Sequence, residues 1–267
     1  MATDPRQILR NAVREKLARG EVVASMTVRL VPGNEIVRIA KTAGFDTLYI
    51  DLEHSGFSVG TAGQIALMAL EAGLPAFVRV PDNTPDYISR VLDGGALGVI
   101  APGVRSAAEA RAVVAAAKFP PAGSRGFGGA LPQLEFRTFP TVETFAAVND
   151  ATMVIVQCES AACLEHVEEI AAVDGIDLVL VGTNDLLADL GLPGQFDHLK
   201  VKDAYARTIA ACRKHGKHVG VGGLASRPDL AAEFVKMGAR FVSTGTDLGF
   251  LLGAATQKAQ QVKEIQL

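Results

Sequence analysis

The 267-residue sequence has no long apolar segment and no secretion signal that we can recognise. No stretch approaches the roughly 18 consecutive apolar residues that a membrane span needs. The N-terminal residues 1–21 carry charges throughout and lack the uninterrupted apolar centre of a signal peptide. These absences lead us to expect a protein with no membrane partner.

Runs of basic residues are absent, and cysteines are few. The formal net charge is -3, and no run of Lys and Arg forms the basic stripe that a nucleic-acid surface needs. The three cysteines, Cys158, Cys163 and Cys212, form no Cys-x-x-Cys pair and leave an odd thiol under any pairing. Such usage is typical of a reducing compartment. We therefore expect a cytoplasmic protein that does not bind nucleic acid.

What the sequence does contain is a repeated pattern of apolar runs. Hydrophobic residues make up 49% of the chain, which is enough for a large core. Eight short runs rich in Val, Ile and Leu alternate with segments of helical spacing, several of which end in a glycine suited to cap a helix. The runs span residues 22–28, 47–54, 76–80, 97–104, 153–159, 177–182, 218–223 and 240–247.

Continuously apolar strands that alternate with amphipathic helices indicate a parallel sheet covered by helices. Eight such units predict a closed (β/α)₈ (TIM) barrel, and we expect residues 1–267 to form a single domain. Residues 5–20 predict an extra N-terminal helix across the bottom of the barrel. The Gly- and Pro-rich residues 120–140 break the pattern, which favours a functional loop or an intersubunit segment.

Polar residues at the carboxyl ends of the strands are the candidates for chemistry, because the active site of this fold lies there. Near these strand ends stand Asp51, Glu53, His54, Arg79, Gln157, Glu159, Asp185 and Asp247. Side chains alternate along a strand, so Gln157 and Glu159 should point into the barrel and Cys158 outward into the helix layer.

Glu159 and Asp185 end adjacent strands, whose axes lie about 5 Å apart. Two carboxylates at that spacing, with no Lys or Arg in either motif, resemble a site for a hard divalent cation with open positions for a substrate. Each could instead cap a helix, since acidic residues are common at helix starts. The pair on neighbouring strands favours the metal.

Three other polar residues suggest acid–base and anion-binding chemistry. His54 could be a base oriented by Asp51, or a hydrogen-bonded histidine of a loop. Arg79 lies inside an apolar strand and needs an anion, which could be Asp51, Glu53 or, as we favour, a substrate oxyanion. Asp247 could simply cap the last helix.

Taken together, these motifs resemble the HpcH/HpaI-type class II (metal-dependent) pyruvate aldolases. The resemblance rests on "AGFDTLYIDLEHS", "AFVRVP", "VLDGGALGVIAPGV", "FPPAGSRGFG", "VIVQCES", "VDGIDLVLVGTNDL" and "GARFVSTGTDLGFL", which occur in the family's order. It covers the chain from about Val22 to Leu252. The joint Gln-x-Glu and Gly-x-x-Asp-Leu motifs are its most specific part.

The resemblance implies a role for each matching residue. Glu159 and Asp185 would ligate a divalent ion, Mg²⁺, Mn²⁺ or Co²⁺. Arg79 would stabilise an enolate, and His54 with Asp51 would form the dyad for proton transfer. The resemblance also implies that Asp93 acts at a subunit interface in a homohexamer, a trimer of dimers.

The substrate-binding segment departs from the family pattern. The family's usual "GPADL" is "GTNDL" here, so that Thr183 has an amide donor that proline lacks and Asn184 adds a side-chain amide. The backbone around Asn184 and Asp185 would hold the carboxylate of a keto acid, with Gln157 as a further substrate contact. The usual "DGEHAP" is "DLEHSG". We expect these changes to affect substrate preference.

The function that follows is aldol cleavage and formation of 4-hydroxy-2-oxo acids from a 2-oxo acid, such as pyruvate or hydroxypyruvate, and an aldehyde. No lysine stands at a strand end, which argues against a Schiff-base aldolase. Two alternatives stay open. The same enolate chemistry could decarboxylate oxaloacetate, or the barrel could bind a metal or keto acid without turnover.

Overall fold

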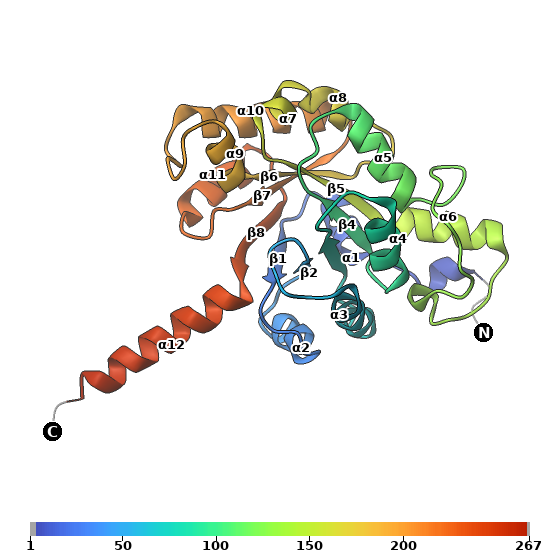
Figure 1. Cartoon of the computed structure of the whole chain (residues 1–267), viewed down its shortest axis with the longest axis horizontal. Coiled ribbons are helices and arrows are strands. Elements are labelled where there is room, and N and C mark those ends of the chain that lie inside the picture. The colour runs from blue at the N-terminus through green and yellow to red at the C-terminus, as the bar shows by residue number, and fades with distance from the viewer. Residues whose placement is uncertain (1–3, 266–267) are drawn as a thin grey trace.

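The eight predicted strands form one closed parallel barrel, in which each strand pairs with the next and β8 pairs with β1 (Figure 1). The computed structural model describes residues 4–265. All eight apolar runs of the sequence are strands, which confirms the TIM barrel. The strands are β1 (Val23–Val28), β2 (Thr47–Asp51), β3 (Ala76–Arg79), β4 (Gly98–Ala101), β5 (Met153–Cys158), β6 (Leu178–Gly182), β7 (His218–Gly222) and β8 (Phe241–Thr246).

The helices that follow the strands cover the outside of the barrel, except where α12 leaves it. Ser58 illustrates the local signals: its hydroxyl accepts a hydrogen bond from the Thr61 amide at 3.0 Å and caps the start of α3. The helices are α2 (Glu35–Thr42), α3 (Val59–Glu71), α4 (Pro85–Asp93), α5 (Ala107–Ala117), α6 (Thr141–Ala151), α7 (Ala161–Glu165), α8 (Val167–Ala171), α9 (Thr183–Asp189), α10 (Leu199–Lys214), α11 (Pro228–Met237) and α12 (Asp247–Lys263).

Two buried apolar clusters lie on opposite faces of the strands. Met153 and Ile155 of β5 belong to the cluster inside the barrel, whereas Val156 and Cys158 belong to the cluster between strands and helices. This alternation confirms that Cys158 points outward. It also puts Gln157 on the inward face, directed toward the carboxyl end of the barrel.

A short N-terminal segment closes the amino end of the barrel. Val13 and Leu17 of α1 (Ala12–Ala18) join the inner cluster and are almost fully buried. The predicted helix over 5–20 is divided into a 3₁₀ turn, η1 (Pro5–Gln7), and α1. The division arises because the Asn11 side chain caps α1, accepting from the amides of Val13 and Arg14 at 3.1 and 3.2 Å.

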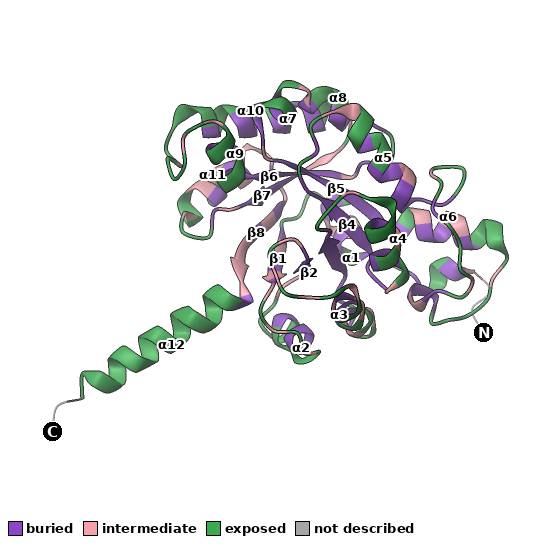
Figure 2. Cartoon of the chain, viewed as in Figure 1, coloured by how far each residue is buried: buried purple, intermediate pink, exposed green. Residues whose placement is uncertain are grey.

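The last helix, α12, packs on the barrel only through its first turn, where the Phe250 ring lies 5.9 Å from that of Phe45, and then projects away from it (Figures 1 and 2). Of its residues only Asp247 is buried. Its exposed face includes large apolar side chains, among them Phe250, Leu251 and Leu252. An apolar hollow of about 630 Å³ over β1 and β8, between Phe45 and Val235, marks where an eighth covering helix would lie.

The insert at residues 120–140 is irregular, as predicted, and contains one 3₁₀ turn, η2 (Pro132–Leu134). Its Arg125 is buried against the Phe119 ring, with the guanidinium carbon 4.6 Å from the ring centroid. Among residues 4–265, no helix is long and apolar enough to cross a membrane.

Candidate active site

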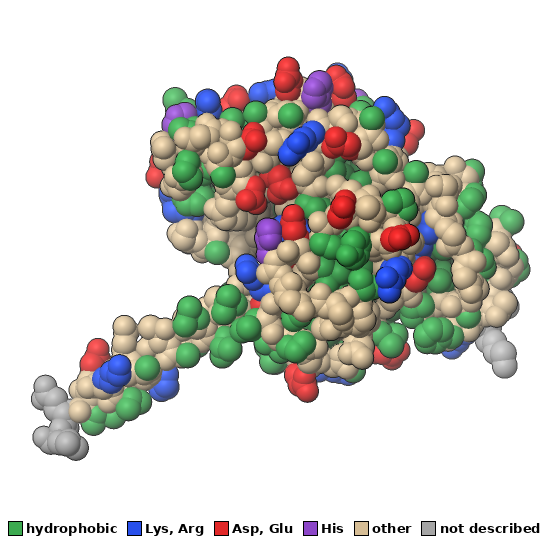
Figure 3. All heavy atoms as spheres, viewed as in Figure 1, with side chains coloured by type: hydrophobic (Ala, Val, Ile, Leu, Met, Phe, Trp, Pro, Cys, Tyr) green, Lys and Arg blue, Asp and Glu red, His purple; other side chains and the backbone are tan. Residues whose placement is uncertain are grey.

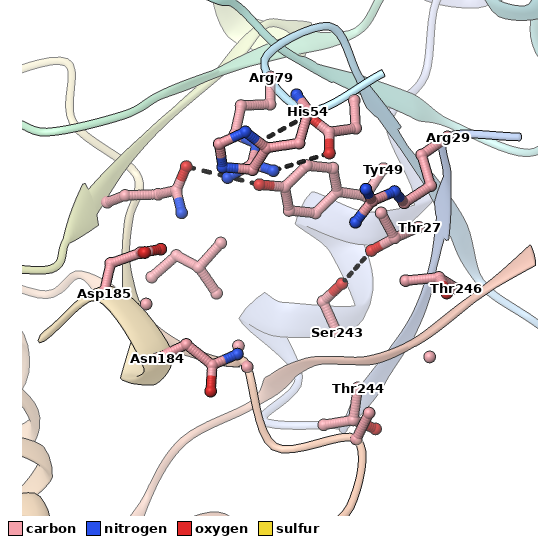
Figure 4. Close-up of a pocket in the computed structure, with 18 of the residues that line it drawn as sticks. Thr27, Arg29, Tyr49, His54, Arg79, Asn184, Asp185, Ser243, Thr244 and Thr246 are labelled. Carbon is pink, nitrogen blue, oxygen red and sulfur yellow. Dashed lines mark hydrogen bonds and ion pairs between the residues drawn. The ribbon is translucent and has the colours of Figure 1, made fainter. Parts of the chain in front are cut away.

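A cavity of about 370 Å³ opens at the carboxyl ends of the barrel strands. Acidic side chains and a histidine gather around the hollow at the centre of this face (Figure 3). Figure 4 shows the side chains that point into the cavity from several strands. The predicted residues that line it are Asp51, His54, Arg79, Gln157, Asn184 and Asp185.

Arg79 is held on one wall of the cavity by two carboxylates. Its Nε and Nη2 atoms donate to the two oxygens of Asp51 at 2.9 and 2.7 Å, and Nη1 lies 2.8 Å from Oε2 of Glu53. Asp51 is 1% exposed, so this is a buried, bidentate ion pair. The guanidinium carbon also lies 5.4 Å from the centroid of the Tyr49 ring.

The ionisation of these groups follows from their contacts. Burial acts to raise the pKa of Asp51, but the hydrogen bonds and charge of Arg79 outweigh it and lower that pKa. Burial raises the pKa of Glu53 despite Arg79. For Arg79, burial is outweighed by Tyr49, Asp51 and Glu53, which raise its pKa, so the guanidinium stays charged.

The structure does not bring the His54 ring to Asp51, which corrects the predicted dyad. Asp51 accepts the backbone amide of His54 at 3.2 Å, while its oxygens are occupied by Arg79. The imidazole Nε2 instead lies 3.8 Å from the carboxylate of Glu53. The His54 side chain is 52% exposed at the rim of the cavity, where a substrate can reach it.

Glu159 is positioned by its neighbours from three strand ends. Its Oε1 accepts the Gly103 amide at 2.6 Å, and its Oε2 accepts Nε2 of Gln157 at 3.2 Å. Gln157 is itself placed by the Tyr49 hydroxyl, 3.4 Å from Oε1. A Cβ on Gly182 would lie 2.8 Å from Oε2 and 3.1 Å from Cβ of Glu159, so the Glu159 side chain would have to shift if any other residue stood there.

The charge around Glu159 is predominantly negative. Burial raises the pKa of Glu159, the Gly103 amide lowers it, and the negative charges of Asp185 and Glu53 raise it again. Carboxylates that repel one another in a cavity with few cations suit a divalent cation. Among residues 4–265 no group of three or more His, Cys, Asp or Glu side chains could hold a metal, so a site here would use two carboxylates with open positions.

The segment after β6 divides its residues between cavity and core. Asn184 and Asp185 are exposed and line the cavity, as predicted (Figure 4). The Thr183 side chain does not line the cavity, so any substrate contact of Thr183 would be through its backbone amide, as predicted from the sequence. Its hydroxyl is fully buried, 2.9 Å from the Tyr205 hydroxyl, and donates to the Gly222 carbonyl at 2.7 Å.

Asp93 also lies outside the cavity of its own chain. It is the last residue of α4, which runs back from the carboxyl end of β3 toward the amino end of β4. Its carboxylate pairs with Nη2 of the buried Arg125 at 2.6 Å. A catalytic role for Asp93 would therefore require a neighbouring subunit, as the resemblance implied.

Several cavity residues were not among the sequence candidates. Arg29 and Thr27 come from the end of β1, and Ser243, Thr244 and Thr246 come from β8. The rule that polar residues at strand ends are functional could have found Arg29, which follows β1 by one residue. Asp247 was also a candidate, but it is not among the residues that line the cavity. Its carboxylate accepts the backbone amides of Arg29, Leu30 and Val31.

Comparisons with known proteins agree with this architecture. The HpcH/HpaI aldolase/citrate lyase family matches residues 28–254. A 4-hydroxy-4-methyl-2-oxoglutarate aldolase of Hapsidospora irregularis is 41% identical over 261 residues, 96% of each chain. A 2-keto-3-deoxy-L-rhamnonate aldolase of Escherichia coli is 34% identical over 258 residues, 96% of this chain and 94% of that one.

The fold matches a solved structure of the same kind. The crystal structure of an HpcH/HpaI aldolase from Desulfitobacterium hafniense has a TM-score of 0.89 and 31% identity, covering 95% of this chain and 97% of that one. The fold and the cavity are those of a TIM-barrel enzyme with its site at the strand ends. More particularly, the chain belongs to the HpcH/HpaI aldolase/citrate lyase family.

Proposed function

We propose that this protein is a metal-dependent aldolase that cleaves and forms 4-hydroxy-2-oxo acids. Its aldolase class follows from the family and from its named relatives. The observation that supports a metal-dependent reaction is that Glu159 and Asp185 lie at the same strand ends as the buried, charged Arg79. Together these residues would bind a cation and an oxyanion.

Glu159 and Asp185 would hold the cation, Mg²⁺, Mn²⁺ or Co²⁺. Both are carboxylates, the ligands that hard cations prefer, and Gly103 and Gln157 already fix the orientation of Glu159. A divalent cation supplies Lewis-acid polarisation of a keto acid, which makes its neighbouring C–H group more acidic. Asn184 and the first amides of α9 would orient the carboxylate of the keto acid.

Arg79 would stabilise the negative charge of the enolate. Of the five N–H groups of a guanidinium, three are used by Asp51 and Glu53, which leaves two for a substrate oxygen. Because the two carboxylates fix the plane of the guanidinium, little reorganisation is needed when the charge develops. Asp51 is thus a positioning residue for Arg79.

His54 would move the proton at the rim of the cavity. A neutral imidazole can take a proton from the methyl group of the keto acid and return it to the product. The nearby carboxylate of Glu53 would stabilise the imidazolium that forms. The enolate carbon would then attack the carbonyl carbon of the aldehyde, and the reverse steps would cleave the carbon–carbon bond.

Chelation tests the proposal directly. We expect a chelator to abolish cleavage of a 4-hydroxy-2-oxo acid and Mg²⁺ or Mn²⁺ to restore it. Glu159→Gln should lower kcat/KM beyond the roughly 10–100-fold typical of residues that only support a ligand. Glu165→Gln, an exposed glutamate on α7, is the matched control. Full activity after exhaustive chelation would contradict the proposal, and faster turnover of oxaloacetate would favour a decarboxylase.

We also propose a homo-oligomer in which α12 of one copy covers β1 and β8 of another. The apolar face of α12 (Figure 3) and the apolar hollow between Phe45 and Val235 are complementary surfaces, both open to solvent in one chain. A hexamer built as a trimer of dimers would extend this contact. Leu252→Glu should lower the mass measured by light scattering, whereas Gln257→Glu on the same helix should not.

The buried free thiols Cys158, Cys163 and Cys212 support a reducing, cytoplasmic location.

A further inference from the structure

The cavity is wider than the catalytic residues require. His54 and Arg79 come from the loop after β2 and from β3, and Asp185 follows β6, while the wall between β6 and β2 comes from the loop after β7, β8 and β1. Figure 4 shows Arg29, Thr27, Ser243 and Thr246 on that wall, on the side of the cavity away from Asp185. No step of the proposed mechanism uses these side chains.

Arg29 stands at the end of the inward face of β1. Val23 of that face belongs to the inner cluster, and Thr27 and Arg29 follow it at intervals that keep them on the same side. The Arg29 side chain is partly buried and lines the cavity. Within residues 4–265 its guanidinium has neither an ion-pair partner nor a hydrogen-bond acceptor.

The carboxylate of Asp247, which lies against the backbone of Arg29, already accepts several hydrogen bonds. Asp247 is 4% exposed and accepts backbone amides of Arg29, Leu30 and Val31 at 3.1, 2.9 and 2.8 Å, together with its neighbour Leu248 at 2.9 Å. These bonds fix the backbone that carries Arg29 without neutralising its guanidinium. The charge remains available to a ligand in the cavity.

Two hydroxyl groups beside Arg29 add hydrogen-bonding capacity. Oγ1 of Thr27 and Oγ of Ser243 lie 3.0 Å apart and share one hydrogen bond. In such a pair one hydroxyl donates to the other, and the accepting hydroxyl keeps its own proton for a third partner. Both Thr27 and Ser243 line the cavity, so the free donor is available to a ligand there whichever hydroxyl carries it.

We infer that Arg29, with Thr27 and Ser243, binds a carboxylate on the acceptor half of the substrate. This inference rests on the proposed aldolase function and narrows it to 4-hydroxy-2-oxo acids that carry a second carboxylate at the far end. One guanidinium fork matches the two oxygens of a carboxylate. Arg29 follows β1 and Arg79 ends β3, with β2 between them, so the two guanidinium groups come from separate strands and each would serve a different oxygen group of the same substrate.

Two substrates that differ only at the far end test the subsite: 4-hydroxy-2-oxoglutarate, which ends in a carboxylate, and 4-hydroxy-2-oxopentanoate, which ends in a methyl group. The measurement is the ratio of their kcat/KM values with Mg²⁺ supplied. We expect the protein to favour the dicarboxylate. Arg29→Gln should lower the ratio by about 10–100-fold, as expected for loss of a charged hydrogen bond. Arg29→Lys should lower it less, since it keeps the charge and loses the fork.

Arg38→Gln provides the matched control, because Arg38 is exposed on α2 outside the cavity and should leave the ratio unchanged. Since the Arg29 side chain makes no hydrogen bond to the described chain, Arg29→Gln should fold, which a thermal melt checks. An unchanged ratio in Arg29→Gln, or an equal loss on both substrates, would overturn the subsite alone. Cleavage of neither substrate by the unaltered protein would overturn the aldolase function and the subsite with it. A second pair of substrates, the aldehydes glyceraldehyde 3-phosphate and glyceraldehyde, differs by a phosphate. If the ratio of kcat/KM values for this pair exceeds the ratio for the dicarboxylate pair, the choice of a carboxylate is overturned.

Discussion

The two ends of the barrel are built from the same eight strands but differ in how their charges are used. At the amino end, α1 inserts Val13 and Leu17 into the inner cluster, and Arg14 pairs with Asp177 at 2.8 Å. Lys118 nearby donates to the carbonyl oxygens of Asn149 and Thr152. Both of these basic groups have partners within the chain.

At the carboxyl end, charge is concentrated and only partly compensated. Arg79 satisfies Asp51 and Glu53, but Glu159 has amide partners only, and Arg29 has no partner among the described residues. The difference teaches that one end is organised for stability and the other for binding charged molecules. Substitutions at the two ends should therefore separate stability from activity.

Arg79→Met should produce the largest effect, and it should lower both the activity and the stability. Loss of the oxyanion donor should lower kcat by about 10²–10³-fold. Because Asp51 would be left buried and unpaired, unfolding should also become easier by about 3–5 kcal/mol. Urea unfolding and steady-state kinetics measure the two losses.

The double variant Asp51→Asn with Arg79→Met serves as the control for that result. It removes the unpaired charge, so most of the stability should return while the activity stays low. Recovery of activity in the double variant would contradict the role of Arg79 in catalysis.

Leu17→Ala should affect the amino end alone. Leu17 is 2% exposed in the inner cluster, and truncation of a buried leucine costs about 2–5 kcal/mol. Activity per folded molecule should not change, because the cavity lies at the other end. Thermal unfolding checks the first part, and kinetics well below the transition checks the second. Leu199→Ala, at an 81% exposed leucine, should change stability by no more than about 0.5 kcal/mol.

Lys118, at the amino end, should have a smaller effect on the free energy of unfolding, and this effect should depend on pH. Burial lowers the pKa of Lys118 from 10.5 to about 8. Below pH 8 the folded chain buries a charged Lys118, which lowers the free energy of unfolding. Between pH 8 and 10.5 the unfolded chain binds more protons at Lys118 than the folded chain does. The free energy of unfolding should therefore rise with pH in this range.

The comparison that isolates this effect is with Lys118→Met. The stability of the original chain relative to the variant should increase by about 2–3 kcal/mol between pH 7.5 and 10. Buried Cys158 and Cys212, whose pKa values are raised, act in the opposite direction in both chains and cancel in the difference. A flat difference across this range would show that Lys118 keeps its ordinary pKa.

The barrel and its inward-facing strand residues were predictable from sequence because both follow from periodicity. Alternation along β5 put Gln157 and Glu159 inside and Cys158 outside, and the structure agrees. Parallel strands bring their carboxyl ends to one edge, so Asp185 and Arg79 could be expected to line one cavity, which they do.

Residues just beyond the strands were harder to place, because alternation ends with the strand. His54 follows β2 by three residues, and the loop backbone turns its ring toward Glu53 instead of Asp51. Thr183 begins α9, where the helical backbone directs its hydroxyl to Tyr205. Which side such residues face depends on tertiary contacts that one sequence does not specify.

Gly182 shows why the polar residues alone do not define a working site. Since a Cβ there would come within 2.8 Å of Oε2 of Glu159, Gly182→Ala would displace a carboxylate without removing any charged residue. A chain could lose activity through one added methyl group and still display Asp51, Arg79, Glu159 and Asp185. When other genomes are searched for active members of this kind, the residue beside the carboxylate should therefore be compared together with the carboxylate itself.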